Sequence, residues 1–389
     1  MTGLGSVFAL CLLALQQAGA KPATRPAEAT KLEKIVAAEL ESLHEKGRFP
    51  GACVSFVLAN GIQGAVAVGH ADADTKEKLT VEHRLMSGSI GKTWVAALAL
   101  QLVREGKVGL DAKVAQWFAR EEWFARVPNA AALTMRMLLR HQSGIEEHVR
   151  DPAFAADVRA EPRREWKPAE LVAYVLDKKP LFAPGKGWSY ADTNYILAGM
   201  VLERVLGTTY YGAVKERLLA PLGLTDTVPS DRPKIDRLAQ GHLAEHNPFG
   251  LPTRAQKDGE MIVNPQLEWT GGGFALTTKN LARWGNLLYS GKVTGPRLRD
   301  VMLDGVRTGR PGETYGLAVF SRTSKLGRVH GHSGWFPGYA AQLAFYPQYG
   351  LTVALQINSS DWGKLRAHPR LIADGIAAKL AAELLPVRR

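Results

Sequence analysis

The sequence is poor in cysteine, with only Cys11 and Cys53 in 389 residues. Cys11 lies in an N-terminal apolar run, so a chain that loses this run keeps Cys53 alone and can form no intramolecular disulfide. Basic residues exceed acidic ones by 49 to 37, but no basic run is interleaved with aromatic side chains. This argues against a nucleic-acid-binding protein. Internal repeats and low-complexity tracts are also absent, so a 46% apolar content indicates an ordinary globular fold, which we expect to form two joined lobes.

The apolar run at residues 7–15 is too short to cross a bilayer. Ala18-Gly19-Ala20 follows it and matches the small-residue cleavage site of a secretory signal. We therefore expect residues 1–20 to be a signal peptide and residues 21–29 a linker. The mature protein is then expected to be periplasmic or secreted, with no stable membrane span.

Two common catalytic signatures are missing. No serine lies in G-x-S-x-G, which excludes the α/β-hydrolase elbow. Gly91-Lys92-Thr93 resembles the end of a phosphate-binding loop, but the first glycine of that motif falls on Met86. His330 and His332 alternate onto one strand face, yet no third ligand follows at a characteristic spacing. We predict no metal and no cofactor.

The secondary-structure signals change along the chain. Thr30 and Glu33 form a capping-box pattern that predicts a helix start. Asn60-Gly61 predicts a hairpin between strands at 52–59 and 62–69. Hydrophobic periodicity predicts helices at 89–105, 135–141, 169–176, 194–206, 213–220 and 278–289. The last third predicts strands at 315–322, 329–332, 339–347 and 351–358, and then a helix within 365–385 that starts or breaks near Pro369.

This order predicts an α+β fold, in which an antiparallel sheet is flanked by N- and C-terminal helices and carries an inserted all-helical lobe. Residues 30–88 and 290–389 are expected to form the α/β lobe, and residues 89–289 the mainly helical lobe. The active site is expected between the lobes. The polar, weakly periodic segment 230–269 is expected to be a long loop that helps to decide substrate choice.

Ser89 and Lys92 provide the first chemical signature, S-x-x-K. One helical turn apart, the two side chains would share a face, so the lysine could accept the serine proton. Taken alone the pattern is expected about once by chance in a chain of this length, and a helix cap with a solvated lysine would also explain it.

Two later segments add candidate residues. Tyr190 and Asp192 follow a Pro-Gly loop and lead directly into a helix. Alone, Tyr190 would be a half-buried packing residue and Asp192 a helix N-cap. The second segment is His330-Gly331-His332-Ser333-Gly334-Trp335, where the glycines would let a substrate backbone approach a strand.

The order S-x-x-K, Y-x-N/D, H-x-G resembles the serine β-lactamase and penicillin-binding protein superfamily. The nearest branch is the class C-like one, which holds D-alanyl-D-alanine carboxypeptidases, class C β-lactamases and family VIII carboxylesterases. The resemblance runs over about residues 32–385. It includes the flanking phrases Leu110-Asp111, Leu138-Leu139-Arg140-His141-Gln142-Ser143-Gly144-Ile145, Pro221-Leu222-Gly223-Leu224 and Gly271-Gly272-Gly273-Phe274.

The resemblance implies roles for eight residues. Ser89 would be the nucleophile, Lys92 its base and Tyr190 the proton shuttle, while His332 would polarise the tyrosine and a substrate carboxylate. Asp192 would hold Lys92, Ser333 would bind the substrate carboxylate, and Gly334 and Trp335 would border the substrate. The backbone N–H groups of Ser89 and Trp335 would form the oxyanion hole.

The resemblance implies a serine hydrolase that forms an acyl-enzyme, and a D-Ala-D-Ala carboxypeptidase-like or penicillin-interactive enzyme is the first expectation. The partner would be a small molecule or peptide with a free carboxylate. Asp192 departs from the asparagine of penicillin-recognising relatives and cannot donate to a substrate amide carbonyl, which disfavours efficient β-lactam turnover. A carboxylesterase is the first alternative. A non-catalytic penicillin-binding or envelope-sensing protein is the second.

Overall fold

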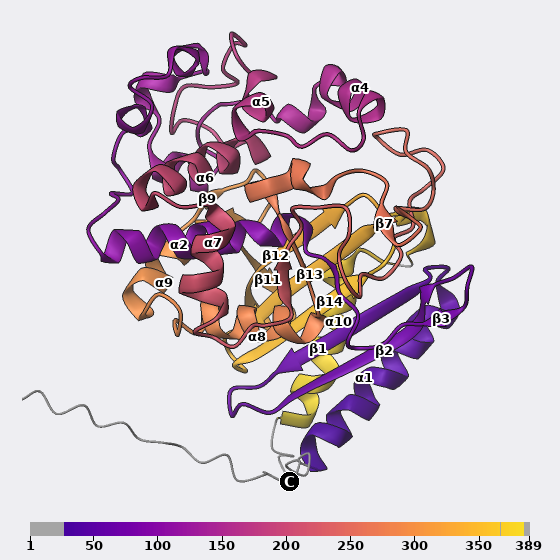
Figure 1. Cartoon of the computed structure of the whole chain (residues 1–389). Helices are drawn as coiled ribbons and strands as arrows, with labels where there is room; N and C mark the ends of the chain where they lie inside the picture. The colour runs from indigo at the N-terminus through magenta and orange to yellow at the C-terminus, as the bar shows by residue number, and fades with distance from the viewer. Residues whose placement is uncertain (1–26, 366, 385–389) are drawn as a thin grey trace, which may run out of the picture.

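A nine-stranded antiparallel sheet is the framework of the computed structural model, which describes residues 27–365 and 367–384 (Figure 1). The strand order is β3-β2-β1-β14-β13-β12-β11-β10-β9. The bounds in chain order are β1 (Gly51–Val57), β2 (Gln63–Asp72), β3 (Glu77–Lys78), β9 (Val306–Arg307), β10 (Thr314–Tyr315), β11 (Phe320–Ser324), β12 (Gly327–Phe336), β13 (Tyr339–Tyr346) and β14 (Leu351–Ile357).

The two ends of the chain meet in this sheet. β1 pairs with β2 on one side and with β14 on the other, so that Val54 lies opposite both Val66 and Leu355. The predicted hairpin at Asn60-Gly61 is confirmed, since Gly61 has a left-handed φ of 86° and the Asn60 side chain accepts the N–H of Ile62. The predicted α+β architecture is also confirmed.

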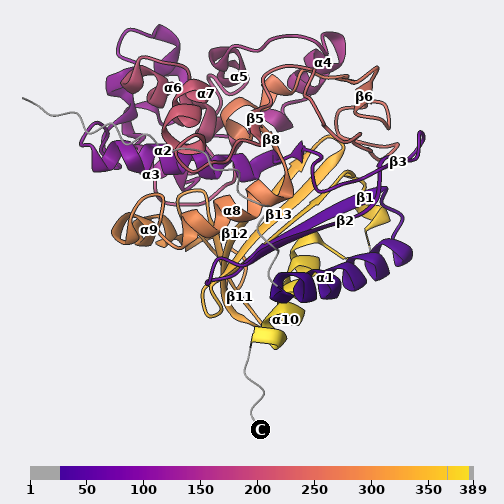
Figure 2. The same ribbon diagram turned by 60° about the horizontal axis from the view of Figure 1, so that its bottom comes forward.

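Helices cover both faces of the sheet. α1 (Ala27–Lys46) and α10 (Pro369–Leu384) lie side by side on one face, and α8 (Thr278–Tyr289) packs against β1, β13 and β14 on the other (Figure 2). The alternation along β13 shows the two faces: Leu343 belongs to the core that contains α8, and Ala344 to the core under α1 and α10.

Most of the remaining elements lie between β2 and β9 in the amino-acid sequence. The other α-helices are α2 (Lys92–Arg104), α3 (Met135–Leu139), α4 (Pro152–Ala160), α5 (Pro168–Ala173), α6 (Asp192–Leu206), α7 (Tyr210–Val214) and α9 (Pro296–Leu303). The 3₁₀ turns are η1 (Gly88–Gly91), η2 (Val114–Trp117), η3 (Glu122–Arg126), η4 (Ala130–Ala132), η5 (His148–Arg150), η7 (Pro265–Gly271) and η8 (Trp362–Lys364), and η6 (Lys215–Leu219) is a π-helical turn. The short strands are β4 (Leu85–Met86), β5 (Thr227–Pro229), β6 (Gln256–Lys257), β7 (Glu260–Met261) and β8 (Phe274–Leu276).

Several predicted bounds differ from the structure. α1 already includes Ala27, so the predicted cap Thr30 lies inside the helix; Ala27, Glu28 and Ala29 are good helix formers. The linker predicted for residues 21–29 therefore ends before Ala27. The predicted strand 315–322 is interrupted by residues 316–319, where Ala318 has a φ of 57°.

Other predictions concern the lobes and the N-terminus. α8 falls within the range predicted for the helical lobe, yet it packs against the sheet. The predicted signal peptide at residues 1–20, and residues 21–26 of the linker, lie outside the described residues. Over residues 27–365 and 367–384, no helix combines the length and apolar character needed to cross a membrane.

Candidate active site

Ser89 lies in the 3₁₀ turn η1, and Lys92 is the first residue of α2. Because residues i and i+3 eclipse each other in a 3₁₀ turn, the two side chains lie on the same side. The Lys92 Nζ donates to Ser89 Oγ at 3.0 Å. The proximity predicted from S-x-x-K is therefore present, but it is a 3₁₀ turn and not an α-helix that produces it.

Two glycines let η1 approach its neighbours closely. A Cβ atom at Gly91 would lie 1.6 Å from the carbonyl oxygen of Gly272, and one at Gly334 would lie 1.9 Å from the carbonyl oxygen of Ser87. Any side chain at either position would push η1 away from residues 271–273 or from β12. The position of Ser89 therefore depends on glycine on both sides.

Lys92 is fully buried and is surrounded by three oxygen acceptors. Its Nζ lies 3.0 Å from Ser89 Oγ, 2.5 Å from the Gly271 carbonyl oxygen and 2.5 Å from Asp192 Oδ1. The contacts with Ser89 and Gly271 are hydrogen bonds, whereas the contact with Asp192 is an ion pair. Asp192 is the first residue of α6, where it holds Lys92, and the N-cap position belongs to Ala191.

Tyr190 lies beside the same ammonium group. The Lys92 Nζ is 4.9 Å from the centre of the Tyr190 ring, and the ring packs on His141 with 4.2 Å between centroids. Among the residues that the structure describes, the buried Tyr190 hydroxyl makes no hydrogen bond of good geometry, and Ser89 is the side chain near enough to interact with it weakly. Burial raises the pKa of Tyr190 well above its usual value, and the Asp192 carboxylate raises it further, whereas Ser89 opposes this shift. The hydroxyl thus keeps its proton in the resting site.

His332 is buried in a chain of hydrogen bonds. Its Nε2 lies 3.0 Å from the Tyr315 hydroxyl and its Nδ1 2.7 Å from the Ser333 carbonyl oxygen, while the Tyr315 hydroxyl lies 3.2 Å from His141 Nε2. The Ala191 N–H donates to His141 Nδ1. These contacts fit one set of tautomers, in which His141 Nε2–H donates to Tyr315, Tyr315 donates to His332 Nε2, and His332 Nδ1–H donates to Ser333.

This geometry differs from the arrangement predicted for His332. Its two ring nitrogens are engaged by Tyr315 and Ser333, and its ring centroid is 6.2 Å from that of Tyr190. Burial and the Lys92 charge lower the pKa of His332 to about 3, so the ring is neutral near pH 7. A neutral, fully engaged imidazole cannot supply positive charge to a substrate carboxylate.

Ser333, Gly334 and Trp335 occupy the end of β12 that β11 does not reach, because the β11 pairing stops at Gly331. The Ser333 hydroxyl donates to Gln342 Oε1 at 2.7 Å. The Trp335 ring lines the cavity next to Ser89 and stacks on Phe249. Trp335 therefore borders the cavity, and the Ser333 hydroxyl is engaged within the protein; substrate binding by Ser333, Gly334 and Trp335 stays a prediction. The oxyanion hole of Ser89 and Trp335 stays a prediction.

A cavity of about 220 Å³ opens beside Ser89 and Tyr190. Most of its wall is apolar and comes partly from the loop predicted at 230–269; the apolar lining residues are Val149, Val158, Phe249, Leu251, Val263, Leu267, Trp335, Phe336 and Pro337. The wall also contains Asp192, Glu147, Glu268, His148 and Arg150. Sequence reasoning missed both glutamates and His148, since single residues at loop positions carry no spacing signal.

Glu268 is the more buried of the two glutamates. Burial and the Asp192 carboxylate raise its pKa to about 8, far above the value near 4.5 expected in an unfolded chain. Between these two values the native state binds more protons than the unfolded state, so stability falls as pH rises through this range.

We therefore expect the melting temperature of the native protein, relative to that of Glu268→Gln, to fall by roughly 3 °C or more between pH 5 and pH 9. Calorimetry or circular dichroism at several pH values measures this difference. The buried histidines are the same in both proteins and cancel. Glu260→Gln, at an exposed ion pair with Arg163, is the control and should keep the native slope. If the melting temperatures of Glu268→Gln and of the native protein change with pH in parallel, the raised pKa of Glu268 is wrong.

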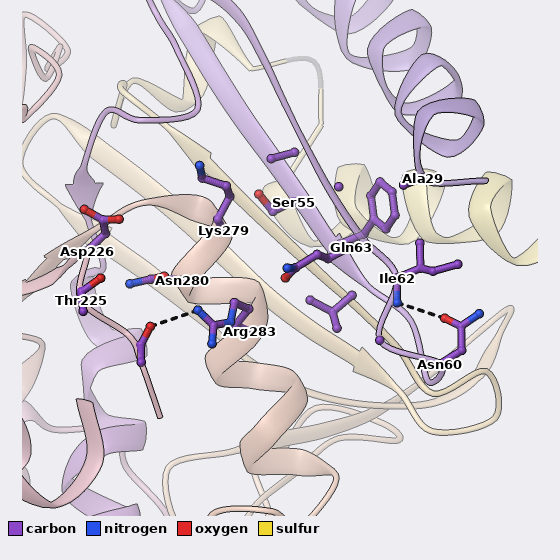
Figure 3. Close-up of a pocket in the computed structure, with 16 residues that line it drawn as sticks. Ala29, Ser55, Asn60, Ile62, Gln63, Thr225, Asp226, Lys279, Asn280 and Arg283 are labelled. Carbon is purple, nitrogen blue, oxygen red and sulfur yellow. Dashed lines mark hydrogen bonds between the residues drawn. The ribbon is translucent and has the colours of Figure 1, made fainter. Parts of the chain in front are cut away.

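A second hollow, of about 680 Å³, lies between the β1–β2 hairpin and α8 (Figure 3). Its charged side chains are already engaged: Lys279 pairs with Glu82, Asp226 with Arg84 and Arg237, and Arg283 donates to the carbonyl oxygens of Leu222 and Gly223. Ser89, Lys92 and Tyr190 do not line it. We place the candidate chemistry in the smaller cavity.

Comparisons with known proteins agree with this arrangement. The family model described as Beta-lactamase matches residues 33–377. Penicillin-binding protein 4* of Bacillus subtilis is 23% identical over 332 residues, which cover 82% of this chain and 70% of that protein. Lovastatin esterase of Penicillium rubens is 30% identical over 201 residues, 47% of this chain and 49% of the esterase. Among solved structures, a D-stereospecific amidohydrolase from Streptomyces sp. superposes with a TM-score of 0.73 at 27% identity, covering 84% of this chain and 94% of that one.

Proposed function

The chain belongs to the β-lactamase family of serine hydrolases, and on this premise we propose that it cleaves an ester or amide by forming an acyl-enzyme on Ser89. The observation that carries the proposal is the contact between Lys92 Nζ and Ser89 Oγ beside a cavity that Ser89 and Tyr190 line. The nucleophile and its neighbouring lysine lie within hydrogen-bond reach, which is the requirement for activating a serine.

In the proposed reaction, Ser89 Oγ bonds to the carbonyl carbon of the substrate and the bond to the leaving group breaks. In one relay, Tyr190 gives its hydroxyl proton to the leaving group and takes the Ser89 proton, while Lys92 holds Ser89 Oγ in place. Water attacks the acyl-enzyme in the second half, and the same groups move its proton. Asp192 keeps Lys92 in place throughout.

For the substrate, the site favours an ester or amide without a free carboxylate at the reacting end. The Ser333 hydroxyl is committed to Gln342, His332 is neutral, and three carboxyl side chains line the cavity. None of these three kinds of group offers a positive charge to an anionic substrate, and Arg150 is the only arginine or lysine among the described residues that line the cavity. This supports the carboxylesterase alternative over a D-Ala-D-Ala carboxypeptidase, and the names of the esterase and amidohydrolase relatives agree with it.

A penicillin-interactive enzyme is the second candidate, because a penicillin-binding protein matches most of the chain. The non-catalytic alternative is less well supported, since an uncommitted tyrosine hydroxyl beside a paired serine and lysine is arranged for proton transfer. The export signal predicted at residues 1–20 would place any of these activities outside the cytoplasm.

The test is a panel of three substrates offered to the purified protein: a p-nitrophenyl ester of a short acyl chain, a labelled penicillin and a peptide ending in D-Ala-D-Ala. We expect ester hydrolysis, with little labelling and no release of D-alanine. Release of D-alanine at a rate comparable to ester cleavage would restore the carboxypeptidase prediction. Inactivity toward all three would favour the non-catalytic alternative.

A further inference from the structure

Tyr315, the last residue of β10, is fully buried and has no role in the motifs or in the proposed reaction. Its hydroxyl lies 3.2 Å from His141 Nε2 and 3.0 Å from His332 Nε2. Tyr315 does not line the cavity beside Ser89, so it is not placed to touch a substrate there. Any effect of Tyr315 on the reaction therefore passes through its two histidine partners.

On one side of Tyr315, His141 holds the segment that carries Tyr190. The Ser189 N–H donates to the His141 carbonyl oxygen at 3.1 Å, and the Ala191 N–H donates to His141 Nδ1 at 3.2 Å. The rings of Tyr190 and His141 pack together with 4.2 Å between their centroids. Both neighbours of Tyr190 in the chain, and the Tyr190 ring itself, thus take their position from His141.

On the other side, His332 belongs to the part of β12 that packs on the nucleophile. Its Nδ1 donates to the Ser333 carbonyl oxygen at 2.7 Å, and β12 is paired with β13 on both sides of His332. Two residues further on, a Cβ atom at Gly334 would lie 1.9 Å from the Ser87 carbonyl oxygen, so β12 lies directly against the turn that carries Ser89. His332 is therefore fixed to the same framework as the nucleophile.

The Tyr315 hydroxyl joins these two sides. A hydroxyl group has one hydrogen and can also accept, so Tyr315 accepts from His141 and donates to His332 at the same time. Over the described residues, no hydrogen bond runs directly between residues 188–192 and β12. The bridge through Tyr315 is thus the hydrogen-bonded connection between the segment of Tyr190 and the strand beside Ser89.

The relay proposed for Tyr190 depends on where its hydroxyl lies. This hydroxyl has to reach both Ser89 and the leaving group, yet it makes no hydrogen bond of good geometry within the described residues that would fix it. Its position is set by the contacts of its ring and of its neighbours in the chain. A displacement of about 1 Å at a reacting group can lower a rate by about 10²-fold.

We propose that Tyr315 is a positioning residue, whose hydroxyl ties His141 to His332 and so holds the Tyr190 hydroxyl within reach of Ser89 for proton transfer. This role rests on the proposed acyl-enzyme reaction, because Tyr190 acts in that reaction. It also gives His332 a part in the site that requires no positive charge on its ring.

Tyr315→Phe, made alone and together with Tyr190→Phe, tests this role with a p-nitrophenyl ester. We expect the single variant to lose about 10- to 100-fold in kcat while KM stays within about threefold, since Tyr315 touches no substrate. When Tyr190→Phe has already removed the hydroxyl that Tyr315 positions, the same substitution should change kcat less than about threefold. A tyrosine that only stabilises the fold would change kcat by the same factor in both backgrounds, or in neither.

Tyr346→Phe is the matched control. Tyr346 is also a buried tyrosine of the sheet, but its hydroxyl donates to Asp374 Oδ1 at 2.6 Å in the core under α10 and does not line the cavity. Its loss should lower the melting temperature, because a buried hydrogen bond is removed, and keep kcat within about twofold of the native value.

His141→Asn is the second variant, and it keeps the inference testable if Tyr315→Phe does not fold. It breaks the same bridge at its other end, and asparagine tolerates the left-handed backbone of this position, where φ is 58°. Its kcat should fall at least as far as that of Tyr315→Phe, and again only while residue 190 is tyrosine.

The positioning role and the proposed function fail in different ways. If esters are hydrolysed through Ser89 and both variants keep the native kcat, or lose as much in the Tyr190→Phe background, Tyr315 does not position Tyr190 and the hydrolase remains. If the native protein hydrolyses no ester and a p-nitrophenyl ester leaves no acyl group on Ser89, the proposed function is wrong and the role of Tyr315 is wrong with it.

Discussion

Replacing Ser89 with alanine is expected to lower kcat/KM for the best ester by at least about 10⁴-fold and to abolish acyl-enzyme formation. The alanine variant lacks the only atom of residue 89 that can attack a carbonyl carbon, and serine hydrolases without their nucleophile keep only a small residual rate. Initial rates with a p-nitrophenyl ester measure the loss. Intact mass spectrometry after rapid acid quench shows whether an acyl group is attached.

Ser87→Ala is the matched control for this variant. Ser87 lies two residues away and is buried, and its hydroxyl donates to the neighbouring Gly88 carbonyl oxygen. It does not line the cavity beside Ser89, so its loss should leave the acyl adduct in place. If Ser89→Ala still forms the adduct, or if Ser87→Ala alone abolishes it, Ser89 is not the nucleophile.

Tyr190→Phe is expected to reduce kcat by about 10²–10⁴-fold while leaving the melting temperature unchanged or slightly raised. The rate falls because the hydroxyl is the proposed donor to the leaving group, and general acid–base groups contribute on this scale. The fold tolerates the change because the hydroxyl makes no hydrogen bond of good geometry over the described residues. Removing such a buried hydroxyl has little or no energetic cost. Steady-state kinetics and thermal unfolding provide the two measurements.

Tyr195→Phe provides the opposite control. The Tyr195 ring also lies close to Lys92, 5.4 Å from Nζ to its centroid, but its hydroxyl donates to the Leu139 carbonyl oxygen at 2.7 Å. Its loss should reduce stability by about 1 kcal/mol and leave the rate within a few-fold. A Tyr190→Phe variant that is destabilised but fully active would make Tyr190 a packing residue, which is the simpler interpretation of its sequence position.

Local rules predicted the parts of the fold that depend on near neighbours. The helix at Thr278–Tyr289 and the turn at Asn60-Gly61 follow from side-chain periodicity and turn chemistry, and both are present. The predicted ends of helices and strands were wrong where local conformational preferences compete with one another or with tertiary packing. Helix formers extended α1 back to Ala27, and the predicted strand at 315–322 breaks near Ala318 because its backbone is left-handed.

The candidate site likewise contains residues that local motifs predicted and residues that only tertiary packing brings together. Ser89 and Lys92 are three residues apart, so one turn of chain brings them together, and ordered motifs marked Tyr190 and Asp192 as further members. Glu147 and Glu268 are more than a hundred residues apart and line one cavity only because α6, whose first N–H Glu147 accepts, packs against η7, which contains Glu268. No spacing in the sequence could have paired them.

The amino-acid sequence by itself determined the family and the α+β architecture, and it pointed to candidate catalytic residues, because helical and strand periodicities and short motifs are local properties of the chain. Only the tertiary structure decided what surrounds those residues. In the folded chain His332 is hydrogen-bonded to Tyr315, and the Ser333 hydroxyl donates to Gln342. Glu147, His148 and Glu268 line the cavity. Burial, ionisation and hydrogen-bond satisfaction depend on neighbours that are distant in sequence, so these properties exist only in the folded chain.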